Sequence, residues 1–101
     1  MRFLIKASLP TEQVNDLLHK PEFPDVISRV LADMRAEATY FGLEGGRRAM
    51  YVVADVKETH HLPRLAEPLW LRLGAEVECI PVMNAEEFGK AGPLLAELTA
   101  G

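Results

Sequence analysis

Two adjacent histidines are the most conspicuous chemical feature of the sequence. His60 and His61 follow a β-prone run that ends at Val56 and precede a leucine-rich segment. Imidazole titrates near neutral pH, so His60 is a candidate general base, or a metal or haem ligand. Adjacent side chains on a helix point about 100° apart and rarely share one metal, and His19 is the remaining histidine. The alternative is that both side chains are solvent-exposed or cap a helix.

Polar side chains on β-prone runs form a second set of candidates. In a partly apolar pocket the pKa values of such groups shift, which suits proton transfer next to a carbonyl. The candidate catalytic residues are therefore His60, Tyr51 and Asp55. The alternative is cross-strand pairing, for example between Lys6 and a glutamate of the last strand such as Glu78.

Aromatic, sulfur and amine side chains could contact a ligand. We take as candidate ligand-binding residues Tyr40, Trp70, Met34 and Lys6. Trp70 and Met34 also fit core or interface packing, because they stand at helical spacing beside leucines. Arg47 and Arg48 could clamp a carboxylate, or simply lie at a solvated hairpin end. Cys79 is expected to be buried in a strand and inert.

Composition predicts an ordinary globular domain spanning residues 1–101. Eleven basic and 15 acidic residues give a formal charge of −4, and no basic stripe indicates nucleic-acid binding. The single cysteine cannot form an intramolecular disulfide. No apolar run approaches the ~20 residues of a membrane span, and Lys6 comes too early for a signal-peptide apolar region. We expect a cytoplasmic protein with no membrane partner, no metal and no cofactor.

Hydrophobic periodicity and prolines divide the chain into strands and helices. The pattern predicts a strand at Phe3–Leu9, helices at Thr11–His19 and Pro24–Ala36, a hairpin at Ala38–Val56, a leucine-striped helix after Thr59, a strand at Ala75–Met83, and a helical tail from Asn84 or Ala85. Gly45-Gly46 supplies the positive φ angles of a tight hairpin turn. We expect Thr11 and Thr59 to cap helices, and Pro68 to cause a kink or a tightened turn in the helix after Thr59.

This order of elements predicts an α+β, ferredoxin-like βαββαβ fold with an antiparallel sheet. The first and third strands should be central, with helices on one face. Pro81 cannot donate to a ladder, so the last strand should lie at an edge or change partners near Pro81. The second face would carry either Tyr51, Val53 and Asp55 or their neighbours on the other side, and both sets are too apolar for water. A homodimer that joins two such faces is therefore expected.

Four short stretches between Ala38 and Met83 resemble one superfamily, the dimeric α/β barrel proteins. These are the Gly45-Gly46 turn, the strand Ala49–Val56, the step Pro68–Trp70 and the strand Glu76–Val82. Within that superfamily the chain is similar to small uncharacterised bacterial families and to muconolactone isomerase. The resemblance implies a homodimer closed through its sheets, or a higher oligomer. It leaves the activity open, because the superfamily also includes cofactor-free monooxygenases.

Three functions follow as hypotheses. The first is a binding protein that holds a small apolar or aromatic metabolite in a cavity between sheet and helices. The second is an isomerase or cofactor-independent oxygenase that uses a histidine or carboxylate as proton shuttle. The third is a structural or subunit-interaction module without a ligand. In each case residues 85–101 could pack on their own chain or on the partner's.

Overall fold

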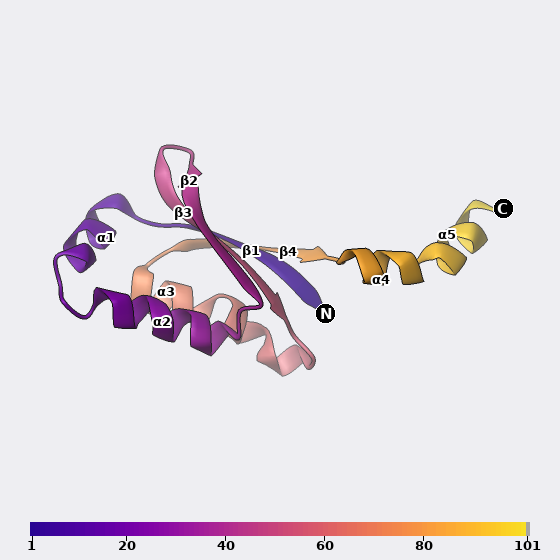
Figure 1. The fold of residues 1–101 in the computed structure, drawn as a ribbon, viewed down its shortest axis with the longest axis horizontal. Helices are drawn as coiled ribbons and strands as arrows, with labels where there is room; N and C mark the ends of the chain where they lie inside the picture. The colour runs from indigo at the N-terminus through magenta and orange to yellow at the C-terminus, as the bar shows by residue number, and fades with distance from the viewer. Residues whose placement is uncertain (101) are drawn as a thin grey trace.

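The computed structural model describes residues 1–100 (Figure 1). Its elements are, in chain order, β1 (Arg2–Ser8), α1 (Thr11–Leu18), α2 (Phe23–Met34), β2 (Ala38–Glu44), β3 (Arg47–Asp55), the 3-10 segment η1 (Thr59–Leu65), α3 (Glu67–Leu73), β4 (Glu76–Val82), α4 (Ala85–Lys90) and α5 (Gly92–Thr99). The four strands form one antiparallel sheet in the order β2-β3-β1-β4. The α+β, ferredoxin-like prediction is therefore confirmed, with β1 and β3 central.

Alternation along the strands gives the sheet two unlike faces. On the helix-covered face, Ile5 lies between Val52 of β3 and Cys79 of β4. On the opposite face, which we call the open face, Leu4 lies between Val53 and Ile80. Side chains of one strand point alternately to the two faces, so this register assigns every other strand residue as well.

The hydrophobic core lies between the sheet and the helices. Ile5, Val52 and Met50 contribute from the strands, and Met34 and Leu69 contribute from α2 and α3. Each of these side chains is almost completely buried, and α2 and α3 lie side by side beneath the sheet in Figure 1. Burial of a side chain of this size stabilises the fold by roughly 1.5–3 kcal/mol, which is why the helices stay on this face.

The hairpin turn follows the sequence prediction. Gly45 and Gly46 have φ angles of 61° and 76°, and these conformations favour residues without a Cβ. Both central residues of the turn have left-handed conformations. This is the two-residue turn whose twist matches the twist of the strands that it connects.

The helix starts differ from the predictions. Neither Thr11 nor Thr59 caps a helix: each is the first residue of its segment, and the preceding residue makes no side-chain capping bond. Pro68 does more than kink a helix, because the leucine-striped segment divides into η1 and a separate α3 that begins just before it. Proline lacks the N–H that a continuing helix needs, whereas the first turn tolerates it.

The prediction for Cys79 was wrong. Its side chain is exposed, although its register places it opposite the buried Ile5. The reason is that β4 is an edge strand, so Cys79 has a neighbouring strand on one side alone. Partial desolvation still raises the pKa of the Cys79 thiol, which opposes thiolate reactivity.

The C-terminal helices project from the body of the molecule. Figure 1 shows α4 and α5 continuing the direction of β4 beyond the sheet, and the whole chain measures 58 × 29 × 19 Å. Asn84 begins α4 with a capping box in which it exchanges hydrogen bonds with Glu87. Arg2 holds this junction, because its guanidinium bonds both Glu37 and Glu87. No helix in the described range 1–100 is long and apolar enough to cross a membrane.

Candidate functional sites

One concavity lies on the open face, at the end of the sheet nearest the hairpin turn. We call it the sheet-face hollow; its volume is about 470 Å³, and it is lined by Lys6, Ala7, Ser8, Glu44, Gly45, Arg47, Ala49, Tyr51, Glu76, Val77 and Glu78. Three carboxylates face two cations there, so the lining is polar and slightly acidic.

A hydrogen-bonded network occupies one wall of the hollow. The Tyr51 hydroxyl donates to Glu44 Oε1 at 2.6 Å, and Lys6 Nζ lies 2.9 Å from Glu44 Oε2. The expected pairing of Lys6 with a β4 glutamate is therefore replaced by a pairing with β2. Glu78 lies directly opposite Lys6 in the ladder but exerts only a weaker electrostatic effect on it.

The three side chains of the network shift one another's pKa values. Hydrogen bonds from Tyr51 and Lys6 lower the pKa of Glu44, and the Glu44 carboxylate raises the pKa of both Tyr51 and Lys6. Each pKa moves away from neutrality. A general acid or base works best with a pKa near the working pH, so this arrangement favours holding a ligand over exchanging its protons.

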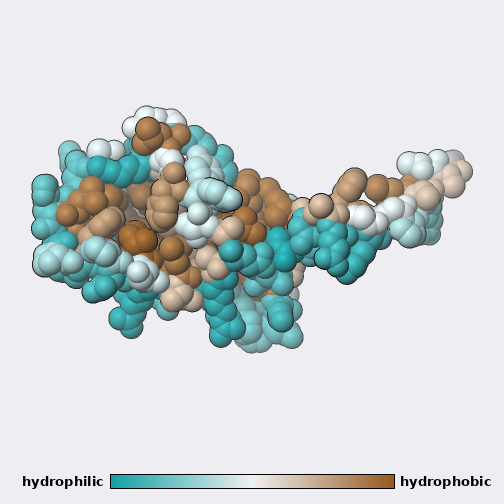
Figure 2. Space-filling view, in the orientation of Figure 1, coloured by the Kyte–Doolittle hydropathy of each residue, from teal (hydrophilic) through white to brown (hydrophobic). Residues whose placement is uncertain are grey.

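A second concavity lies on the other side of the sheet, between its β2 margin and the first two helices. We call it the α1–α2 groove; its volume is also about 470 Å³, and it is lined by Leu9, Val14, Leu18, Phe23, Pro24, Ile27, Phe41, Gly42, Arg48 and Ala49. Apolar surface is visible between α1, α2 and the hairpin in Figure 2. Arg48 is the one charged residue of the lining, and its Nη2 donates to Asn15 Oδ1 at 2.8 Å.

The three predicted catalytic residues lie apart. Tyr51 lines the sheet-face hollow, whereas Asp55, at the far end of β3, pairs with the N-terminal ammonium at 2.9 Å. His60 is exposed on η1, and its ring contacts His61 edge to face with centroids 4.2 Å apart. The histidine is thus not brought to the tyrosine by this fold.

The four predicted ligand contacts also separate. Lys6 lines the sheet-face hollow, and Tyr40 is exposed nearby on the open face opposite Tyr51. Met34 is fully buried in the core, and Trp70 is half exposed on α3.

One residue of the sheet-face hollow, Glu44, was not among the predicted site residues. Only the strand register could have revealed it, because it shows that Glu44 shares the open face with Tyr51. Arg48 was expected either to clamp a carboxylate or to lie at a solvated hairpin end, and the register points it with Phe41 toward the helices.

Within residues 1–100, no three histidine, cysteine, aspartate or glutamate side chains cluster so that they could hold a metal ion.

Fold and sites together define an α+β protein of ferredoxin-like topology with an uncovered sheet face. No protein-family model matches the chain. No curated protein matches its sequence. Among solved structures, the crystal structure of MupZ from Pseudomonas fluorescens is similar over 96% of this chain and 83% of that chain, with 18% identity and a TM-score of 0.42. A similarity of this size does not bear on function.

Proposed function

We propose that the protein is a homodimer that binds a small apolar or aromatic carboxylate in the α1–α2 groove. The observation that carries this proposal is an apolar groove of about 470 Å³ with a single cationic side chain, Arg48, in its lining. Small-molecule sites are typically concave, mostly apolar and furnished with a few polar groups that orient the ligand.

The groove suits such a ligand better than the sheet-face hollow does. Arg48 has no carboxylate partner within the described part of the chain, and its one side-chain bond goes to the neutral amide of Asn15. A guanidinium can form a paired, charge-assisted hydrogen bond to an incoming carboxylate. In the hollow, by contrast, Lys6 is already neutralised by Glu44.

The binding test uses two ligands that differ in charge but share a ring. Phenylacetate and phenylethanol are titrated into the protein while backbone amide shifts are followed by NMR. Phenylacetate should shift the amide resonances of α1, α2 and β2. Arg48→Gln should weaken the binding of phenylacetate by about tenfold and leave the binding of phenylethanol unchanged.

A matched pair of variants tests the location. Phe41→Ser removes one wall of the groove, and Phe88→Ser makes the same change on α4; both side chains are more than half exposed. Only the first should reduce phenylacetate binding. Equal affinity in all these variants, or shifts confined to β4, would rule out the groove.

The open face supports the homodimer. Across its centre runs a cross-strand row of Ala38, Val53, Leu4 and Ile80. A two-fold contact would bury this row against its own copy, and burial of apolar surface is worth roughly 25 cal/mol per Å².

Substitution of the row tests the dimer. Val53→Glu places a charge at its centre and should convert the dimer to a monomer in sedimentation velocity. Leu71→Glu is the control, because Leu71 is 79% exposed on α3, in the helix layer away from that face. A monomeric wild type would refute the assembly.

The enzyme hypothesis retains one supporting observation, the network of Lys6, Glu44 and Tyr51 in the sheet-face hollow. The three pKa directions there oppose proton transfer at neutral pH, so binding is the function that we propose.

A further inference from the structure

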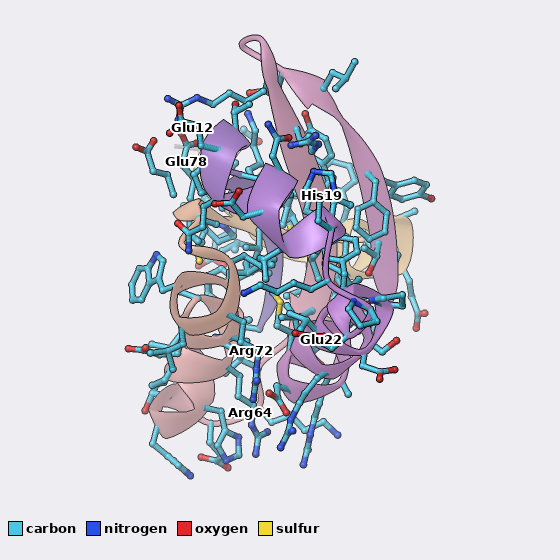
Figure 3. All side chains as sticks on the ribbon, turned by 90° about the vertical axis from the view of Figure 1, so that its left-hand side faces the viewer. Glu12, His19, Glu22, Arg64, Arg72 and Glu78 are labelled. Atoms are coloured by element: carbon cyan, nitrogen blue, oxygen red, sulfur yellow. The ribbon has the colours of Figure 1, made fainter. Side chains whose placement is uncertain are left out.

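A small basic pocket lies at the end of the helix layer, where α2, β3 and η1 meet. Its volume is about 160 Å³, and its lining is Met34, Arg35, Asp55, Val56, Lys57, His61 and Arg64. In Figure 3, Arg64 lies low in the view, whereas Glu12 and Glu78 lie high in it. The basic pocket is therefore separate from the sheet-face hollow, which contains Glu78.

The pocket carries a local excess of positive charge in a protein whose net charge is −4. Within residues 1–100, no carboxylate oxygen lies within 4.0 Å of the charged nitrogens of Arg35, Lys57 or Arg64. Asp55, the single carboxylate of the lining, pairs with the N-terminal ammonium at 2.9 Å. Three cationic side chains thus line one cavity, none of them in a salt bridge with a described residue, against the single carboxylate of Asp55, which also interacts electrostatically with Lys57.

One of these cations, Arg35, has a left-handed backbone conformation, which is uncommon for a residue other than glycine. Arg35 ends α2 with a φ of 53°, the only positive φ among the non-glycine residues described. Its N–H bonds the carbonyl of Ala32 at 3.1 Å, and the N–H of Ala36 bonds Leu31 at 3.2 Å. Glycine is the usual residue at such a helix end, but it would leave the pocket without this guanidinium.

The pKa of His61 is affected by two of these cations. His61 is partly buried, and its pKa is lowered by desolvation first, then by Arg64, His60 and Arg35, with Glu58 acting in the opposite direction. Lys57 and Asp55 are the other charged groups of the lining. An anion in the pocket would offset the nearby cations and make protonation of His61 easier.

We propose that the basic pocket binds a phosphate-type oxyanion, either free or as the head of a phosphate monoester, through Arg35, Arg64 and Lys57. Guanidinium groups pair with phosphate oxygens through two parallel hydrogen bonds, and lysine adds a point charge. The buried side chains of Met34 and Val56 border the pocket and limit access of water to the ion pairs. The volume admits the oxyanion head, so the rest of a monoester would extend into solvent.

The test is a titration of the full chain with inorganic phosphate at constant ionic strength, followed by NMR of the histidine ring protons. We expect saturable binding that chloride does not reproduce, and an upward shift of the His61 pKa when phosphate is bound. Arg64→Gln should weaken binding by roughly tenfold.

Arg35→Gly separates binding from folding. Glycine adopts the left-handed conformation without a steric cost, so this variant should melt at the same or a higher temperature while its phosphate affinity falls. Arg72→Gln is the matched control, because Arg72 is outside the pocket lining and lies 3.8 Å from Asp33 on the helix layer. It should bind phosphate as the wild type does.

Two ligands distinguish the sources of the oxyanion. Tighter binding of glycerol phosphate than of inorganic phosphate would identify the head of a monoester, and equal binding would identify the free anion. The proposal fails if Arg64→Gln and Arg35→Gly bind phosphate as well as Arg72→Gln does, or if the His61 pKa is unmoved by phosphate.

Discussion

At the scale of single residues, the sheet-face network shows how a fold sets protonation without burying its members deeply. Glu44 receives a hydrogen bond from Tyr51 and an ion pair from Lys6, and all three are at least partly accessible to water. Because water screens exposed pairs, the network adds only a small, pH-dependent amount to global stability. Its effect is local, and it can be measured by titration.

The first prediction concerns the phenol of Tyr51. Its pKa lies above the ordinary value of 10.0, because loss of the proton would place a phenolate beside the Glu44 carboxylate. In a Tyr40→Phe background, absorbance at alkaline pH reports Tyr51 alone. Glu44→Gln should lower the midpoint toward the ordinary value. An unchanged midpoint would show that the hydrogen bond does not form in solution.

The second prediction concerns acid. The pKa of Glu44 is lowered from 4.5 in the folded state, so its stabilising contribution is present above that value and lost as the pH falls through the lower folded-state pKa. The melting temperatures of wild type and Glu44→Gln should therefore differ above about pH 5 and converge below the folded-state pKa. A difference that persisted or grew in acid would contradict the assignment.

At the scale of elements, the short α3 depends on how it ends. Gly74 follows Leu73 with a φ of 62°, and the N–H of Gly74 bonds the carbonyl of Trp70 at 3.0 Å. A Cβ at this position would also lie 2.5 Å from the Gln13 side chain. Glycine at the end of α3 thus serves both the left-handed backbone conformation there and the close contact with α1.

The third prediction follows from this fit. Gly74→Ala should destabilise the protein by about 1–2 kcal/mol, chiefly because alanine resists the left-handed conformation. Gly89→Ala is the control: it lies in α4, has no positive φ, and an added Cβ there meets no atom within 4 Å. Urea denaturation measures both. If the two variants were equally stable, the left-handed end of α3 would be in doubt.

Sequence patterns predicted the elements and their order well, because each rests on local chemistry. The Gly45-Gly46 turn, the edge position of the strand containing Pro81 and the start of α4 directly after Asn84 all follow from backbone preferences. The sites could not be predicted in this way. Their residues meet only through register and helix placement: Glu44 reaches Lys6 across β3, and Arg35 reaches Arg64 through the packing of α2 on η1.

At the scale of the whole molecule, the C-terminal tail formed by α4 and α5 exposes several large apolar side chains to solvent. Phe88, Leu94, Leu95 and Leu98 are between 44% and 69% exposed. Ile80 on β4 and Met83, directly after it, are also exposed, and apolar atoms are visible along the projecting helices in Figure 2. A second copy seated on the open face would lie next to this surface.

The fourth prediction is that the tail contacts the partner in the homodimer. Truncation after Asn84 should raise the dimer dissociation constant by more than about tenfold, because apolar surface of α4 and α5 is then lost from the interface. Sedimentation velocity measures the constant, and Leu71→Ala controls for the loss of an exposed leucine elsewhere. An unchanged constant would place the tail outside the interface.

The two margins of the sheet are unequal. β4 contains Pro81, which interrupts its free row of donors, whereas β2 has no proline and exposes Tyr40, Phe41 and Leu43. An uninterrupted apolar edge is a template for strand addition by other chains. In concentrated solution, fibrillar aggregation of this protein should therefore begin at β2, and a lysine in place of Phe41 should delay it.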